Sequence, residues 1–254
     1  MADQPAAVRN ALEAALALVG SRRTDAATAI LGHQFNCFAR EARAIDGRMS
    51  RRQVNIHGAV NLSNAGESPI AFLCPMSVMT SDGMAAIEAI TNSVLAGRPS
   101  ITYGEDMGEL IEREPHLKAF FPRPGGNPLR EILDVLDRNG VFFTYCDFAY
   151  AGHKTVSPEF LGGSRVFSRG FVRLLQKTRP ILVAAYITLD GDVLNVHCEK
   201  PITALRDCPS TPTIEAVSAL VSNATARLVA KLGTQWLLLP TLTFEPAGMA
   251  DATQ

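Results

Sequence analysis

Apolar and polar positions alternate along the chain in blocks that predict strands and helices in turn. Residues 69–74 form a continuously apolar run between turn residues, which is typical of a central parallel strand. Residues 141–146 form a second such run, and residues 180–188 form the longest. Shorter runs at 54–58 and 99–103 predict two more strands. Turn residues separate all of these runs, so the pattern predicts short buried strands rather than buried helices.

Helical spacing of apolar residues fills most of the intervals between these strands. Ser81 or Asp82 is placed to cap a helix over 83–95, and Asn127 with Pro128 predicts the start of another. Thr211 or Thr213 precedes a long amphipathic stretch near the C-terminus. The pattern therefore predicts helices over residues 24–46 (one helix or a pair), 83–95, 129–139, 170–178 and 213–232.

This order of elements predicts an α/β fold with a mainly parallel central sheet and helices on both faces. Asp190-Gly191 separates two strand-like runs and predicts one antiparallel hairpin. We expect residues 1–53 to form a helical segment packed on the core, residues 54–245 to form the α/β domain, and residues 246–254 to be a disordered tail.

Composition narrows the class of protein. Of 254 residues, 47% are hydrophobic and 19% charged, and the net charge of −1 gives no field that would attract DNA. The five cysteines form no CxxC pair, which indicates reduced thiols and a cytoplasmic protein without a metal site. Residues 6–19 carry a mild apolar face that predicts packing on the domain or, at most, peripheral membrane contact.

Polar residues follow two of the buried runs. In open parallel sheets, ligands bind at the carboxyl ends of the strands, which is where these residues would lie. The segment after Cys74 reads Pro-Met-Ser-Val-Met-Thr-Ser-Asp, and Asp147 follows the run at 141–146. Asp147 could orient a base or a substrate, or it could cap the next turn. We expect the loops after Cys74 and after Cys146 to line a cleft.

Five stretches give the chain a resemblance to a known superfamily. They are Ile70-Ala-Phe-Leu-Cys-Pro with its polar loop, residues 129–136 with Gly140, the run ending at Asp147, Phe160-Leu-Gly-Gly with Phe167-Ser-Arg-Gly, and the C-terminal helix with Gln235-Trp236. In this order they resemble the lysophospholipid-acyltransferase-like superfamily, nearest to the bacterial lipid A late acyltransferases and the related mannoside acyltransferases. The resemblance implies an α/β acyltransferase domain.

The resemblance also implies a catalytic histidine with an acidic residue five positions later, in which the histidine deprotonates the acceptor hydroxyl. Here Met76 stands at the histidine position and Ser81 at the acidic one. A shift of one residue places Ser77 and Asp82 at the same separation. Neither methionine nor serine is a general base at neutral pH, so the usual proton acceptor is missing.

Three readings of this change remain open: a base recruited from elsewhere, an acceptor that needs none, or no acyl transfer. His153 is the best substitute base by position, although a solvated loop histidine fits as well. His57 could also approach the cleft, but the sequence favours a structural role for it. An amine or hydroxylamine acceptor is already nucleophilic, so positioning alone could supply much of the acceleration. An acyl-cysteine at Cys74 or Cys146 is conceivable, although burial would make such a thiol inert.

By resemblance, a glycine- and arginine-rich block would hold the acyl donor, which is acyl-CoA or an acyl carrier protein bearing phosphopantetheine. Backbone N–H groups and guanidinium groups suit the phosphates of such a donor. The expected protein is thus a cytoplasmic transferase of specialised biosynthesis that acylates a small soluble acceptor, with a non-catalytic acyl-binding relative and a thioesterase as alternatives. The expected donor-binding residues, besides Met76, are Lys154, Gly162, Gly163, Arg165, Ser168, Arg169 and Gly170.

Overall fold

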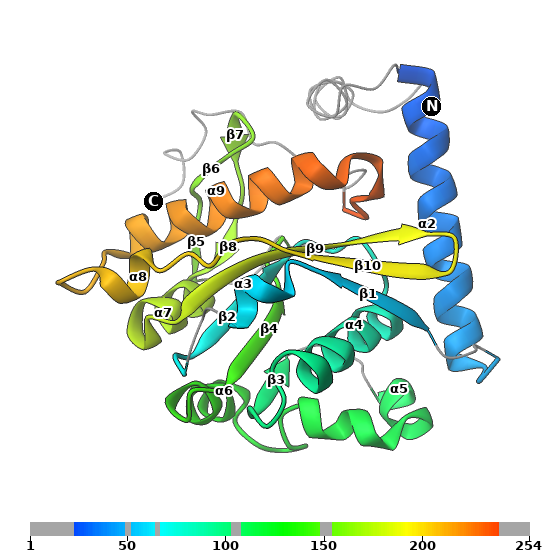
Figure 1. The fold of residues 1–254 in the computed structure, drawn as a ribbon. Helices are drawn as coiled ribbons and strands as arrows, with labels where there is room; N and C mark the ends of the chain where they lie inside the picture. The colour runs from blue at the N-terminus through cyan, green and yellow to red at the C-terminus, as the bar shows by residue number, and fades with distance from the viewer. Residues whose placement is uncertain (1–22, 49–51, 64–66, 103–107, 148–153, 239–254) are drawn as a thin grey trace.

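The computed structural model describes residues 23–48, 52–63, 67–102, 108–147 and 154–238 (Figure 1). A six-stranded sheet has the order β1-β10-β9-β2-β4-β3. The strands are β1 (Gln53–His57), β2 (Ile70–Cys74), β3 (Ser100–Thr102), β4 (Val141–Tyr145), β9 (Ile181–Asp190) and β10 (Val193–Cys198). Within this six-stranded sheet, only the β9–β10 pair is antiparallel. The α/β class, the mainly parallel sheet and the hairpin at Asp190-Gly191 are confirmed.

Alternate residues of the central strands supply the cores on the two faces of the sheet. On one face, Ala71 and Leu73 pack with α6 (Pro128–Asp137), α7 (Arg169–Thr178) and α9 (Ile214–Leu232). On the other, Ile70 and Phe72 pack with α3 (Ala59–Ser63) and α4 (Thr80–Ser93). Successive side chains of a strand point to opposite faces, so a strand covered on both sides must be apolar throughout. This explains the unbroken run in β2.

The helix starts follow their capping chemistry. The Asn127 side chain accepts a hydrogen bond from the Arg130 N–H at the start of α6. The Thr213 side chain accepts one from the Ala216 N–H at the start of α9. The predicted caps of α4 are wrong: α4 begins after Met79, and neither Ser81 nor Asp82 caps it. The Glu41 carboxylate, from α2 (Arg23–Ile45), instead accepts from the Ser81 N–H at 3.0 Å.

Shorter elements complete the described chain. Between β3 and α6 lie α5 (Gly108–Arg113) and the 3₁₀ helix η1 (Pro115–Phe120). The segment before α7 folds into two small antiparallel ribbons, β5 (Thr155–Val156) with β8 (Phe167–Ser168) and β6 (Glu159–Phe160) with β7 (Gly163–Ser164). Near the C-terminal end lie α8 (Ala204–Asp207) and η2 (Gly233–Gln235).

Helix α2 stands at the end of the sheet, across the tip of the β9–β10 hairpin (Figure 1). Its inner face packs on the segment that links β2 to α4 and on η2. The prediction of a helix over 24–46 is confirmed as one continuous helix. The predicted N-terminal helix over 6–19 and the tail 246–254 lie outside the described residues.

Candidate functional site

The carboxyl ends of β2 and β4 meet around Asp147, two residues beyond β4. The Asp147 side chain is fully enclosed, and its Oδ2 accepts hydrogen bonds from the Met76 N–H at 2.9 Å and from the Trp236 indole N–H at 2.6 Å. Its Oδ1 is buried without a hydrogen-bond partner among the described residues. Asp147 therefore ties three separate segments together, and its Oδ1 is left without a side-chain or backbone partner among the described residues.

Arg165 contacts the backbone of the same residue. Its guanidinium donates to the Asp147 carbonyl and sits over the rings of Phe160 and Trp236, 5.5 and 5.7 Å from their centroids. Its Nε–H is buried and has no described partner. An unpaired buried donor and an unpaired buried acceptor in one cluster are unusual, because each carries a desolvation cost. A bound water or ion, or a catalytic role, is the usual explanation for such atoms, and Arg52 in the Asp82 cluster carries another of them.

Burial has the largest effect on the pKa values of Asp147 and Arg165. It raises the pKa of the Asp147 carboxyl, against the opposing effects of the hydrogen bonds from Trp236 and Met76 and of the Arg165 charge. Burial also lowers the pKa of the Arg165 guanidinium, which the Asp147 carboxylate opposes. A carboxylate with a raised pKa is a stronger base than an exposed one, so Asp147 has the electrostatics of a proton acceptor.

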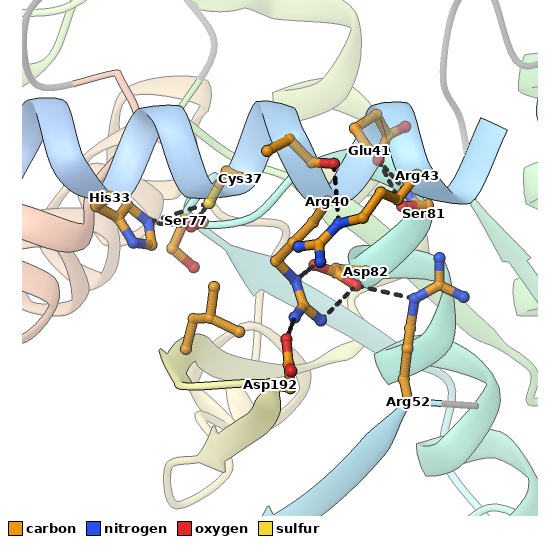
Figure 2. Close-up of polar contacts among 12 residues, drawn as sticks. His33, Cys37, Arg40, Glu41, Arg43, Arg52, Ser77, Ser81, Asp82 and Asp192 are labelled. Atoms are coloured by element: carbon orange, nitrogen blue, oxygen red, sulfur yellow. Dashed lines mark hydrogen bonds and ion pairs between the residues drawn. The ribbon is translucent and has the colours of Figure 1, made fainter. Parts of the chain in front are cut away.

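The other polar residues of the loop after β2 are engaged by α2 (Figure 2). Ser77 donates from its hydroxyl to the Ile187 carbonyl at 2.5 Å, and its own carbonyl is 2.7 Å from Nε2 of His33. Ser77 and Asp82, which have the five-residue separation of the family's catalytic pair, are both buried, and no hydrogen bond joins their described side chains.

Asp82 is the centre of a buried ionic cluster (Figure 2). Arg40 of α2 contacts both of its oxygens, at 2.7 and 3.2 Å, and Arg52 contacts Oδ1 at 2.9 Å. The same Arg40 also reaches Asp192 in the β9–β10 turn at 2.6 Å. With both oxygens committed to arginines, Asp82 anchors α2 and α4 and has the environment of a structural residue.

His57, the described one of the two candidate histidines, does not join Asp147. His57 lies on the edge strand β1, separated from β2 by β10 and β9. It is exposed and stacks on His197 at 4.6 Å, and Tyr186 stacks on the other side of His197 at 4.5 Å. His153 lies outside the described residues. His33 of α2, which was not among these candidates, contacts the loop after β2.

The expected donor-binding residues separate into inward and outward groups. Arg165 is buried, whereas Lys154 and Arg169 are exposed, so the two arginines are not placed together to bind one anion. Ser168 caps α7 by accepting from the Phe171 N–H at 3.4 Å. Gly162 lies at the exposed turn of the β6–β7 ribbon with a φ of +81°, which explains the glycine there. Gly163 continues this ribbon in β7, and Gly170 is exposed in the first turn of α7.

Two further features bear on the chemistry. Burial strongly raises the pKa of the Cys74 and Cys146 thiols, which disfavours a thiolate nucleophile at either position. A hollow of about 320 Å³ lies at the start of α6, between Arg123 and Arg130, but none of the predicted site residues lines it.

The comparisons with known proteins give no relative: neither a protein-family model nor a curated protein matches the chain. Within the described ranges, no three histidine, cysteine or acidic side chains are grouped as metal ligands. The helices that the structure describes include none with the length and apolar character needed to cross a bilayer.

Proposed function

We propose that the protein is a cytoplasmic acyltransferase that moves an acyl group from a thioester, acyl-CoA or an acyl carrier protein, to a small soluble acceptor such as an amine or hydroxylamine. The single observation that supports this proposal is buried Asp147, which accepts from the Met76 N–H through Oδ2 and whose Oδ1 has no partner among the described residues. The resemblance places Met76 where the superfamily has its catalytic histidine. Asp147, a buried base next to that position, would accept the proton that the methionine cannot accept.

The chemistry would proceed by addition and elimination at the thioester carbonyl. The acceptor nitrogen forms a bond to the carbonyl carbon while Asp147 takes one of its protons. The carbon–sulfur bond then breaks, the carbonyl re-forms, and the proton on Asp147 passes to the departing thiolate. The products are an amide or hydroxamate and a free thiol, and the carboxylate is regenerated. General-base help of this kind is worth ~10²–10⁴ in rate.

Arg165 has a supporting role in this scheme. Its buried Nε–H lacks a partner among the described residues and lies in the same cluster as Asp147. A preorganised donor in a site shielded from water stabilises the negative charge that develops on the carbonyl oxygen during attack. We therefore assign Arg165, rather than the exposed Arg169, to the donor side of the reaction.

A specific observation favours a second candidate, a non-catalytic relative that binds an acyl chain or a carrier protein. The side chains of Ser77 and Asp82 and the backbone amide of Ser81 are all committed to structural contacts. A chain that had lost catalysis could use this segment for packing alone. Hydrolysis of the thioester is the third outcome.

Product analysis on the purified full chain separates the three. Acyl-pantetheine and acyl-CoA donors of several chain lengths should be incubated with and without hydroxylamine and primary amines, and the thiol, acid and acyl-acceptor product measured by mass spectrometry. Acyl transfer predicts thiol release that depends on the acceptor. Release with free acid and no acceptor dependence indicates a thioesterase. Donor binding without any release indicates the binding relative, and either result contradicts the proposal.

A further inference from the structure

Helix α2 carries apolar side chains on both of its faces. Its inner face lies against the rest of the protein and buries three of them beside Arg40: Ile30, Cys37 and Ala44. Its outer face carries three large ones at i, i+4 and i+7, which are 64%, 77% and 58% exposed: Leu31, Phe35 and Phe38. A helix that is apolar all round is normally buried all round. The described residues leave the outer face open, so its composition indicates a contact surface.

The outer face has the spacing of a helix that packs along another helix. Five exposed positions, which we call the outer stripe of α2, follow one another at intervals of three and four residues: Thr28, Leu31, Phe35, Phe38 and Ala42. This alternation is that of the a and d positions of a heptad repeat, the seam along which helices pair. No exposed position from residue 28 to residue 42 is charged. The pattern therefore indicates an uncharged helix as the partner.

A second copy of this chain provides such a helix. Soluble oligomers are most often two-fold dimers of one chain, in which the same surface patch forms both sides of the interface. A face without charge can pair with itself without repulsion between like charges. Helix α2 stands at the end of the sheet, so its outer face points away from the body of the molecule (Figure 1). We propose that two copies of the chain form a dimer in which their α2 helices pack antiparallel along the outer stripe, about a two-fold axis at Phe35.

The sizes of the side chains fit this antiparallel arrangement. Two residues equally far from Phe35, one on each side, come level across a two-fold axis at Phe35, because the rise per residue is constant. Phe38 of one copy therefore comes level with Gly32 of the other. By the same count, Leu31 comes level with Ala39. A Cβ added at Gly32 meets no atom within 4 Å, so the space beside this glycine is open in the single chain. Both large side chains thus meet a small one, which lets the two helices approach closely.

The exposed area sets the strength expected of the dimer. The three large side chains of the outer stripe, each about two-thirds exposed, present roughly 300–400 Å² per copy, about half of what each partner of a standard interface buries. Small interfaces form reversible complexes, so we expect a dissociation constant on the order of micromolar. A lipid surface fits less well, because helices that lie on membranes have a basic polar face, whereas Arg40 of α2 is buried inside the protein. This inference does not depend on the proposed function.

Analytical ultracentrifugation of the full chain tests the dimer. Between about 1 and 200 µM, the wild type should pass from monomer to dimer. Phe35→Lys and Phe35→Glu should each weaken self-association at least about tenfold, because each places two like charges at the two-fold axis. An equimolar mixture of the two variants should associate more tightly than either variant alone, because opposite charges then meet. The matched control Val60→Lys, at a 67% exposed position of α3, should associate like the wild type.

Three results would overturn the proposal. They are a wild type that stays monomeric through this range, association that Phe35→Lys leaves unchanged, and a mixture that associates no better than its two components. A monomeric wild type that sediments with anionic vesicles would assign the outer stripe to a membrane. Circular dichroism at low concentration reports folding separately. Because the Phe35 side chain is 77% exposed, both variants should keep the wild-type spectrum, and an unfolded variant cannot imitate the expected result.

Discussion

Replacing Asp82 by asparagine should strongly destabilise the protein. The carboxylate is 1% exposed and is the shared partner of Arg40 and Arg52, whose side chains are 2% and 11% exposed. Asparagine keeps the volume but removes the charge and turns an amide N–H₂ toward arginine donors. Removing one partner of a buried ion pair typically costs 3–5 kcal/mol, roughly a third of the stability of an ordinary domain.

Urea unfolding followed by circular dichroism measures this loss, with an unchanged m value as the sign that the folded state is intact. Asp192→Asn is the matched control, because Asp192 contacts the same Arg40 at 2.6 Å but is 89% exposed and should contribute at most about 1 kcal/mol. Equal stability of the two variants would refute the anchoring role. An Asp82→Asn protein with full stability and no thioester turnover would instead support the catalytic role that the sequence suggested.

Three further predictions follow from the same contacts. Glu41→Ala removes the described acceptor for the Ser81 N–H and should lower the free energy of unfolding in urea by about 0.5–2 kcal/mol. An unchanged urea midpoint would argue against that cap. Gly83→Ala places a Cβ 2.1 Å from the Tyr145 hydroxyl oxygen and should cost about 1–3 kcal/mol despite the better helix propensity; a more stable variant in thermal unfolding would show that the tyrosine moves freely. The pKa of the Asp147 carboxyl is raised from 3.8 in the folded state, so the folded protein binds the Asp147 proton more tightly than the unfolded chain does. The contribution of Asp147 to the free energy of unfolding therefore falls as pH rises through the raised pKa. The stability of Asp147→Asn relative to wild type should therefore increase from below pH 3.8 to pH 7, and urea titrations that show a constant difference would contradict the raised pKa.

Much of the fold could be predicted because local patterns and tertiary packing agree. The apolar run of β2 is buried on both faces, Asn127 and Thr213 cap their helices, and Asp190-Gly191 closes the hairpin. The start of α4 could not be predicted, because its capping oxygen belongs to Glu41, forty residues away. Local capping rules cannot see a donor or acceptor supplied by another helix.

The candidate site was predicted less well, because its contacts also come from segments that are far apart in the sequence. Asp147 was found because it follows a buried strand, and the structure places it beside Met76. The Arg40–Asp82 pair spans 42 positions and has no sequence signature, so Asp82 read as a catalytic candidate. Arg165 was singled out with Arg169, but only the structure separates the buried arginine from the exposed one.

The rate of acyl transfer by wild type and Asp147→Asn is the measurement that tests the central claim most directly. Asparagine can still accept from the Met76 N–H and the Trp236 indole N–H, so the fold should persist while the proton acceptor is lost. With a saturating thioester donor and an amine acceptor, we predict that kcat falls ~10²–10⁴-fold in the variant. Equal kcat values in two folded proteins, or no acceptor-dependent turnover by the wild type, would contradict the assignment of Asp147 as the base.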